Sequence, residues 1–236
     1  DHLSSPNVVV HTYAAATLEK ILCLQNTSPT GVKVNKILGS DLQPYLTPLF
    51  NGLFSIISNQ EWNENEHAMK CIMRALNVAR DDVVPVTQIV LEQLTNVVAR
   101  VSKNPRNPHF NHYSFEAIAV LVRGNFSVDP NRTAMFEPLL FPPFESILQA
   151  DVVEFIPYVF QIMAQMLEYR PAASGLGDAF QTLLPPLLMP PLWQRKGNVP
   201  ALTRLLQAYV EQAASQLNDQ LTAILGVFQQ LLSNKA

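Results

Sequence analysis

The sequence contains the same helical pattern several times, at intervals of about 40–50 residues. In each copy an apolar helix, usually with proline, is followed by a short polar turn and then by a second, amphipathic helix. We expect the second helices to begin near Asn7, Glu64, Pro108, Asp151 and Asn198, which are 57, 44, 43 and 47 residues apart by subtraction. The first interval is longer because it includes a long loop. A helical period of this length is typical of stacked helix pairs.

We name the first helix of each pair A and the second B. The pattern predicts an all-α fold, a HEAT-repeat α-α superhelix (solenoid) with about four A–B helix pairs and a half repeat at each end. The predicted ranges are B 6–23, A 41–57, B 64–79, A 83–102, B 109–123, A 133–149, B 151–168, A 176–194, B 198–213 and A 219–233. We expect residues 1–236 to be a single HEAT-repeat segment excised from a longer solenoid.

Local signals define several of the predicted helix ends. Asn7 or Ser5 is expected to cap the first helix, and Asp41 and Asp151 are expected to cap the helices that they begin. Four of the five predicted A helices contain proline, which removes a backbone hydrogen bond and kinks a helix. Pro157 is an exception, because it lies in a B helix. Residues 24–40 are predicted to form a loop, and no strand is predicted anywhere.

The composition fits an array of helices that bury much of their surface against each other. Only 15% of the residues are charged, whereas 48% are hydrophobic. No apolar run reaches the ~18 residues of a membrane span, so no membrane partner is expected. The net charge of −3 argues against nucleic-acid binding driven by charge. Two cysteines cannot build a disulfide framework, and they favour a reducing compartment.

The predicted half repeats at the two ends have no unusually polar cap. Burial of one amphipathic helix face contributes several kcal/mol at ~25 cal/mol per Å². We therefore expect the isolated segment to self-associate through its two open ends.

Two basic clusters are candidate protein-binding sites. Between Glu92 and Glu116 the chain contains no acidic residue. The first cluster lies in this interval and consists of Arg100, Lys103, Arg106, His109 and His112; the second consists of Arg195 and Lys196. Such a cluster could face an acidic partner surface. The alternative is that both are ordinary solvated turns.

Other reactive patterns have simpler explanations. His109 and His112 are spaced like a metal-binding pair, but no nearby Cys, Asp or Glu completes a site. Cys23 and Cys71 are expected to be buried core thiols on successive B helices. Three glycosylation sequons, at Asn26, Asn125 and Asn131, are attributed to chance. The sequence predicts no catalytic residue, no metal site and no cofactor.

Four stretches of the sequence resemble one family. They begin at Ser5-Pro6-Asn7-Val8-Val9-Val10-His11-Thr12-Tyr13, at Val101-Ser102-Lys103-Asn104-Pro105, at Asp151-Val152 and at Gly197-Asn198. The third continues through Glu154-Phe155-Ile156-Pro157-Tyr158, and the fourth through Arg204-Leu205-Leu206-Gln207-Ala208. Together they resemble the CAS exportins (cellular apoptosis susceptibility proteins) of the karyopherin-β family. Residues 24–40 and 170–180 match this family poorly.

The resemblance implies a large HEAT solenoid that binds importin-α and Ran-GTP in the nucleus and releases both in the cytoplasm. This chain would be a middle-to-later part of such a receptor, without its N-terminal Ran-binding repeats. No short motif of the family identifies contact residues here. One alternative is a HEAT-repeat scaffold of another complex with no Ran dependence. Another is an all-helical enzyme, which would need a deep polar pocket around His109 and His112.

Overall fold

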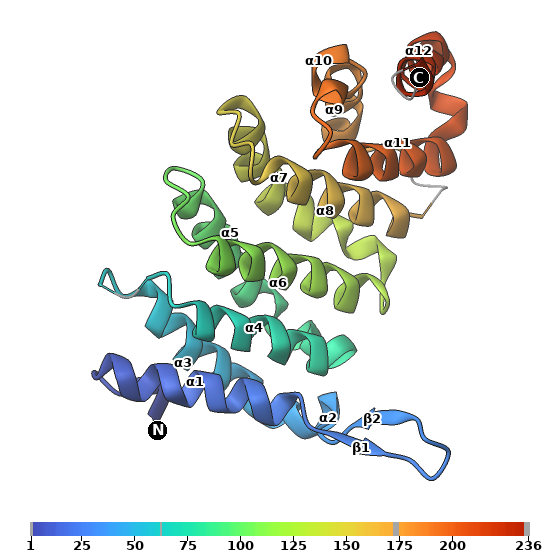
Figure 1. The fold of residues 1–236 in the computed structure, drawn as a ribbon. Helices are drawn as coiled ribbons and strands as arrows, with labels where there is room; N and C mark the ends of the chain where they lie inside the picture. The colour runs from blue at the N-terminus through green and yellow to red at the C-terminus, as the bar shows by residue number, and fades with distance from the viewer. Residues whose placement is uncertain (1, 62, 172–174, 234–236) are drawn as a thin grey trace. The chain divides into compact units, whose positions relative to one another are not determined.

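The computed structural model describes residues 2–61, 63–171 and 175–233, and these residues are almost entirely helical. The all-α fold class predicted from the sequence is confirmed. The chain divides into two compact units, Asp1–Asp129 and Pro130–Ala236. Each unit consists mainly of helices (Figure 1). No described helix is both long and apolar enough to cross a membrane.

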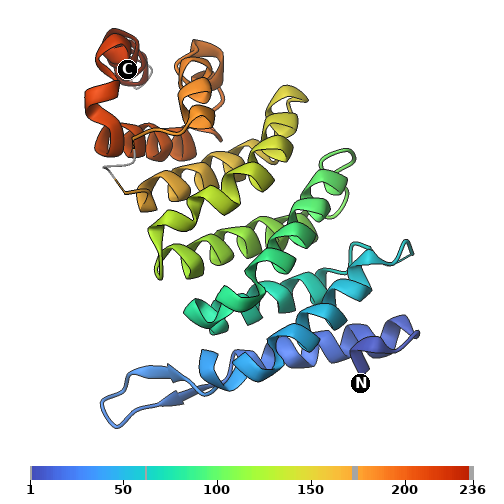
Figure 2. The ribbon, with the colours of Figure 1, turned by 180° about the vertical axis from the view of Figure 1, so that it is seen from behind.

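The first unit contains three B helices, two main A helices and a hairpin. The B helices are α1 (Val8–Leu22), α4 (Glu66–Ala79) and α6 (Pro108–Phe126), and the A helices are α3 (Leu46–Ser58) and α5 (Thr87–Val101). The short α2 (Gly39–Leu42) precedes α3, and strands β1 (Gln25–Thr27) and β2 (Lys33–Asn35) pair between α1 and α2. Helices α1, α4 and α6 lie side by side in one layer, with α3 and α5 in the second layer (Figures 1 and 2).

The second unit repeats the arrangement. Its B helices are α8 (Ile156–Tyr169) and α11 (Val199–Ala213), which pack extensively against each other. The other helices are α7 (Thr133–Gln149), α9 (Asp178–Leu187), α10 (Pro190–Gln194) and α12 (Leu221–Ser233). 3-10 turns precede or follow helices in both units, at His2–Ser4, Gln43–Tyr45, Arg80–Val86, Pro130–Arg132, Ala214–Gln216 and Asn218–Gln220.

The core follows from the apolar stripes of the B helices. In α4, Met69, Ile72 and Leu76 are completely or almost completely buried. They recur at three- and four-residue spacing, so they form a single apolar face of α4, a helix that contacts α1, α3 and α6. Burial of this face stabilises α4, because few helices of this length are stable alone in water.

Asparagine begins the three B helices of the first unit. The side chain of Asn7 accepts a hydrogen bond from the amide of Val9, as Asn65 does from Ala68 and Asn107 from Phe110. These bonds satisfy amides that the helix itself leaves unpaired. The amide group of Asn65 also donates to Thr12 Oγ1, and that of Asn107 donates to the Glu64 carbonyl. These two asparagines therefore join each B helix to the preceding repeat.

Polar contacts between repeats recur at nearly constant sequence separation. Arg123 donates to Asn77, 46 residues earlier, and Ser127 donates to Asp81 at the same separation of 46. In the second unit the bond from Gln212 to the Glu168 carbonyl spans 44 residues. These separations equal the helical period of the sequence, as expected where each repeat bonds to its immediate neighbour.

The structure corrects several predicted helix boundaries. The range 41–57 divides into α2, a 3-10 turn that contains Pro44, and α3. The range 83–102 begins with the 3-10 turn that contains Pro85, and the α-helix begins only at Thr87. The range 176–194 contains two helices, because Pro190 begins α10. In contrast, α7 continues through Pro138, Pro142 and Pro143. Pro157 lies in the first turn of α8, where its missing N–H removes no helical bond.

Two predicted caps and one predicted loop are also corrected. Asp41 lies inside α2 and accepts from the Leu38 amide, so it does not begin the long helix. Asp151 has φ of 52° and precedes α8 by several residues. Within residues 24–40, where only a loop was expected, a two-stranded hairpin forms. Two three-residue strands are too short to produce a clear periodic signal.

Candidate protein-binding surface

Arg100, from the first basic cluster, joins two repeats. Its guanidinium donates from Nη1 to the Ile57 carbonyl at 3.1 Å and from Nη2 to the Asn63 carbonyl at 2.8 Å. Partial burial lowers the pKa of Arg100, and the charge of Glu64 acts in the opposite direction. The side chain thus bonds to carbonyls at the end of α3 and in the following turn. Both terminal nitrogens of its guanidinium group already have acceptors within the chain.

The other members of this cluster lie on the turn after α5 and on the first turns of α6. Lys103, Arg106 and His109 are exposed, and within the described residues their side chains form no hydrogen bond or ion pair. His112 is exposed too, and its ring lies 5.4 Å from the ring of Tyr113. Among the described residues, no group of three His, Cys, Asp or Glu side chains could hold a metal ion.

A cleft of about 530 Å³ adjoins this turn. Arg100 and Arg106 line it, but so do Glu61 and Glu64. The basic character expected from the sequence is therefore offset by carboxylates of the preceding repeat. The sequence between Glu92 and Glu116 could not predict this compensation, because Glu61 and Glu64 lie about one repeat earlier in the chain.

The second cluster is partly used within the second unit. Arg195 binds the Asp151 carboxylate with both Nη atoms, and the Nη2–Oδ2 distance is 2.7 Å. This hydrogen bond lowers the pKa of Asp151 and raises that of Arg195. Lys196, the next residue, is exposed and forms no ion pair within the described part of the chain. Of the two residues, only Lys196 presents an uncompensated charge.

A charged cluster that was not predicted from the sequence connects the B helices of the first unit. Glu19 of α1 is 9% exposed and lies 3.7 Å from Lys70 Nζ and 3.5 Å from Arg74 Nε. Lys70 Nζ is also 5.8 Å from the ring centroid of Tyr113 on α6. Lys70 and Arg74 are four residues apart and share one helix face, which is the one signal that the sequence offered.

The two cysteines have different environments. Cys71 is completely buried, and burial raises the pKa of its thiol to about 12. Cys23 is exposed and donates to Glu19 Oε1 at 3.3 Å. Partial burial and this hydrogen bond raise the pKa of Cys23. The expectation of a buried thiol is therefore correct for Cys71 and wrong for Cys23.

Asn125, one of the three sequon asparagines, is completely buried and accepts a hydrogen bond from the Thr87 hydroxyl at 2.8 Å.

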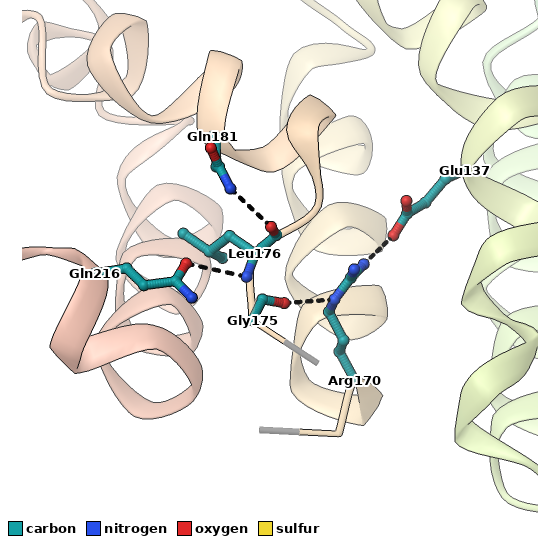
Figure 3. Close-up of polar contacts among 6 residues, drawn as sticks. All are labelled: Glu137, Arg170, Gly175, Leu176, Gln181 and Gln216. Atoms are coloured by element: carbon teal, nitrogen blue, oxygen red, sulfur yellow. Dashed lines mark hydrogen bonds and ion pairs between the residues drawn. The ribbon is translucent and has the colours of Figure 1, made fainter. Parts of the chain in front are cut away.

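In the second unit, polar contacts join Arg170, Gly175 and Leu176, which lie between α8 and α9, to neighbouring helices (Figure 3). Arg170 forms an ion pair with Glu137 of α7, and its Nε donates to the Gly175 carbonyl at 2.7 Å. The next residue, Leu176, donates to Gln216 and accepts from Gln181 of α9. The network therefore connects the α7–α8 pair with the helix pair that follows it. It contains no free nucleophile, and we assign it a structural role.

The second unit also contains an apolar groove of about 440 Å³. Phe141 of α7, Phe160 of α8 and Leu187 of α9 contribute to its lining. These side chains are buried in the structure, and more exposed residues such as Glu145 and Thr182 form the rim. Neither this groove nor the cleft in the first unit is lined by His109 or His112.

Comparisons with known proteins agree with this architecture. Residues 19–236 match the family model described as CAS/CSE protein, C-terminus. Exportin-2 of Xenopus laevis is 42% identical over 239 residues, and Exportin-2 of Homo sapiens is 40% identical over 240. Both alignments cover 100% of this chain and 24% of the relative, so the chain spans about a quarter of its curated relatives.

A solved structure gives the same result. It is titled "The exportin Cse1 in its cargo-free, cytoplasmic state" and superposes with a TM-score of 0.80 at 33% identity. The match covers 98% of this chain and 23% of the solved chain. It confirms the HEAT-type helical repeat predicted from the sequence. Together with the family model, it shows that this chain belongs to the CAS/CSE family of exportins.

Proposed function

We propose that this chain is a middle-to-later part of a nuclear export receptor that carries importin-α from the nucleus to the cytoplasm in complex with Ran-GTP. The observation that supports this most strongly is similarity along the whole chain to proteins named Exportin-2. We place the protein in both compartments, as a shuttling carrier requires. No cofactor and no catalytic step enters this proposal.

Repeat architecture suggests how such a receptor works. Each repeat bonds mainly to its neighbours, as the contacts of Asn107 with Glu64 and of Gln212 with Glu168 illustrate. In an array of this kind, small rotations between neighbours add up to a large change in curvature. A partner that binds one curvature better than another shifts the population toward it. Two partners that favour the same curvature then strengthen each other's binding.

Within this chain, we propose the exposed part of the first basic cluster as a partner contact. Lys103, Arg106 and His109 have no ion pair among the described residues, so an acidic partner surface could approach them. Lys196 is a second, smaller candidate. We leave Arg100 and Arg195 out of the proposed contact, because their guanidinium groups are already bonded within the chain.

The test is the affinity of the full-length parent protein for importin-α, measured with Ran-GTP, with Ran-GDP and without Ran. The proposal predicts that Ran-GTP, but not Ran-GDP, raises the affinity for importin-α at least ~10-fold. A change of this size is within the usual range of coupling between sites. Equal affinity in all three conditions would instead support a HEAT-repeat scaffold with no Ran dependence.

A further inference from the structure

The β1–β2 hairpin extends away from the helices of the first unit in both views (Figures 1 and 2). Its strands pair Gln25 with Asn35, Asn26 with Val34 and Thr27 with Lys33. The same register continues beyond the strands, because the Lys36 amide donates to the Leu24 carbonyl and the Ser28 amide donates to the Val32 carbonyl. Gly31, with φ of 81°, lies in the turn.

This register divides the hairpin into two chemically different faces. Side chains alternate along each strand, so Leu24, Val32 and Val34 lie on the same face as Asn26, Ser28 and Lys36. The opposite face carries Gln25, Thr27, Lys33 and Asn35, which are all polar. On that face Gln25 donates to Asn35 at 3.2 Å. We call the first the apolar face of the hairpin.

The apolar face is open to solvent. Leu24 is 48% exposed, Val32 59% and Val34 48%. A two-stranded hairpin alone is marginally stable in water and normally needs a helix or further strands against its apolar side. Among the described residues no third strand pairs with the hairpin, and the exposure of these three side chains leaves room for a covering element from outside.

Charge indicates what that element is. The segment 20–40 contains Lys20, Lys33 and Lys36 and no Asp or Glu, although the whole chain has a net charge of −3. A covering element with carboxylates is therefore favoured, and Lys36 lies on the apolar face itself. The same segment contains no Phe, Tyr or Trp. It thus lacks the stacking groups of single-stranded nucleic-acid sites and the aromatic anchors of membrane surfaces.

We propose that the hairpin is a docking arm for an acidic, amphipathic helix of a partner protein. Apolar side chains of that helix pack on Leu24, Val32 and Val34, and its carboxylates lie beside Lys36. Helix binding through apolar anchors at three- and four-residue spacing is a common recognition mode. The inference depends on the hairpin alone and does not require Ran-dependent binding.

The experiment uses the full-length parent and a labelled 18-residue probe peptide with a leucine face flanked by glutamates. One comparison peptide has the same composition with the leucines scrambled, and another has lysine in place of glutamate. Fluorescence anisotropy should show binding of the acidic amphipathic peptide only. Its affinity should fall as salt rises, because exposed charges are screened within about 10 Å at 0.1 M.

Matched variants locate the binding to one face. Val32→Thr with Val34→Thr keeps the β-branched shape that strands favour and removes the apolar contact, so affinity should fall at least ~5-fold. Thr27→Val changes the opposite face and should leave affinity unchanged. Lys36→Gln should weaken binding more than Lys33→Gln, since only Lys36 shares the apolar face. Far-UV circular dichroism checks that every variant retains its helices.

Four outcomes would overturn the proposal. The first is equal binding of the ordered and scrambled peptides, and the second is an affinity that the Val32→Thr, Val34→Thr variant leaves unchanged. The third is binding of anionic vesicles or single-stranded RNA that this double variant abolishes. In that case the arm recognises lipid or RNA. The fourth is a dimer in analytical ultracentrifugation that the double variant converts to monomer, which would show that a second copy covers the face.

Discussion

Single residues in this chain have roles that depend on distant partners. The sequence offered Asn7 or Ser5 as the cap of the first helix, and Asn7 is the cap in the structure. Such a prediction is possible because a cap and its helix are adjacent. The sequence did not indicate the bonds of Arg100, whose acceptors Ile57 and Asn63 lie 43 and 37 residues earlier. A run of basic residues shows where positive charge is concentrated. It cannot show which charges are already bonded to carbonyls of another repeat.

Arg100 should therefore affect stability more than its exposed neighbours do. Arg100→Lys retains the charge but loses the planar fork that reaches two carbonyls. We expect a loss of about 1–3 kcal/mol in the free energy of unfolding, measured by urea denaturation. Lys103→Ala, the control on the adjacent exposed turn, should change it by less than about 0.5 kcal/mol. Similar values for the two variants would contradict the proposed structural role of Arg100.

Cys71 gives a prediction about pH. Burial raises its pKa in the folded protein to about 12, whereas an unfolded thiol titrates near 8.5–9. The neutral thiol is therefore stabilised by folding, and this contribution is complete below pH 8.5 and declines as pH rises toward 12. Above pH 9 the free energy of unfolding should fall by up to about 1.4 kcal/mol per pH unit from this group.

Cys71→Ala should remove that part of the slope between pH 9 and 10, below the main titration range of tyrosine. The parallel variant Cys23→Ala changes an exposed thiol and should leave most of the slope in place. Chemical denaturation at closely spaced pH values measures both. An unchanged slope in Cys71→Ala would show that the buried thiol does not control the alkaline loss.

At the scale of elements, the order of helices was predictable and their exact ends were not. Long amphipathic patterns such as that of α4 predicted a helix over 64–79, where the structure has Glu66–Ala79. Proline gave ambiguous information, since Pro85 lies in a 3-10 turn while Pro142 lies inside α7. Whether a proline ends a helix depends on the contacts that neighbouring repeats make with that part of the backbone. These contacts cannot be read from a single sequence. The hairpin was missed for a different reason, its short strands.

Two helical glycines differ in how closely neighbouring atoms pack against them. A Cβ at Gly124 of α6 would lie 2.7 Å from the Arg80 carbonyl oxygen, whereas a Cβ at Gly226 of α12 would have no atom within 4 Å. Gly124→Ala should destabilise the protein by about 1–3 kcal/mol through overpacking. Gly226→Ala should stabilise α12 by up to about 1 kcal/mol, because alanine favours helix. Thermal melts of both variants test the pair, and effects of the same sign would contradict this packing.

At the scale of the molecule, the sequence predicted the repeat architecture and the family, because both depend on patterns along the whole chain. It did not predict which surfaces are open. Tyr13 of α1 is 71% exposed, and Leu225 and Leu232 of α12 are 57% and 73% exposed. These residues are apolar or largely apolar, and exposed apolar patches mark surfaces that associate.

The 236-residue chain on its own should therefore self-associate. Light scattering over a wide range of protein concentrations should show an increasing mean mass. Replacement of Leu225 and Leu232 by glutamine should reduce the effect, and the same change at Val153, an exposed residue outside the helices, serves as the control. A monomer at every concentration would contradict the expectation.

The central proposal is that shape, set by contacts between neighbouring repeats, governs partner binding. The most direct test is small-angle neutron scattering of the deuterated full-length parent, free and bound to importin-α and Ran-GTP, with both partners contrast-matched to the solvent. We predict that the radius of gyration of the receptor changes beyond experimental error when the complex forms. Superimposable scattering curves from the free and fully bound receptor would contradict this account.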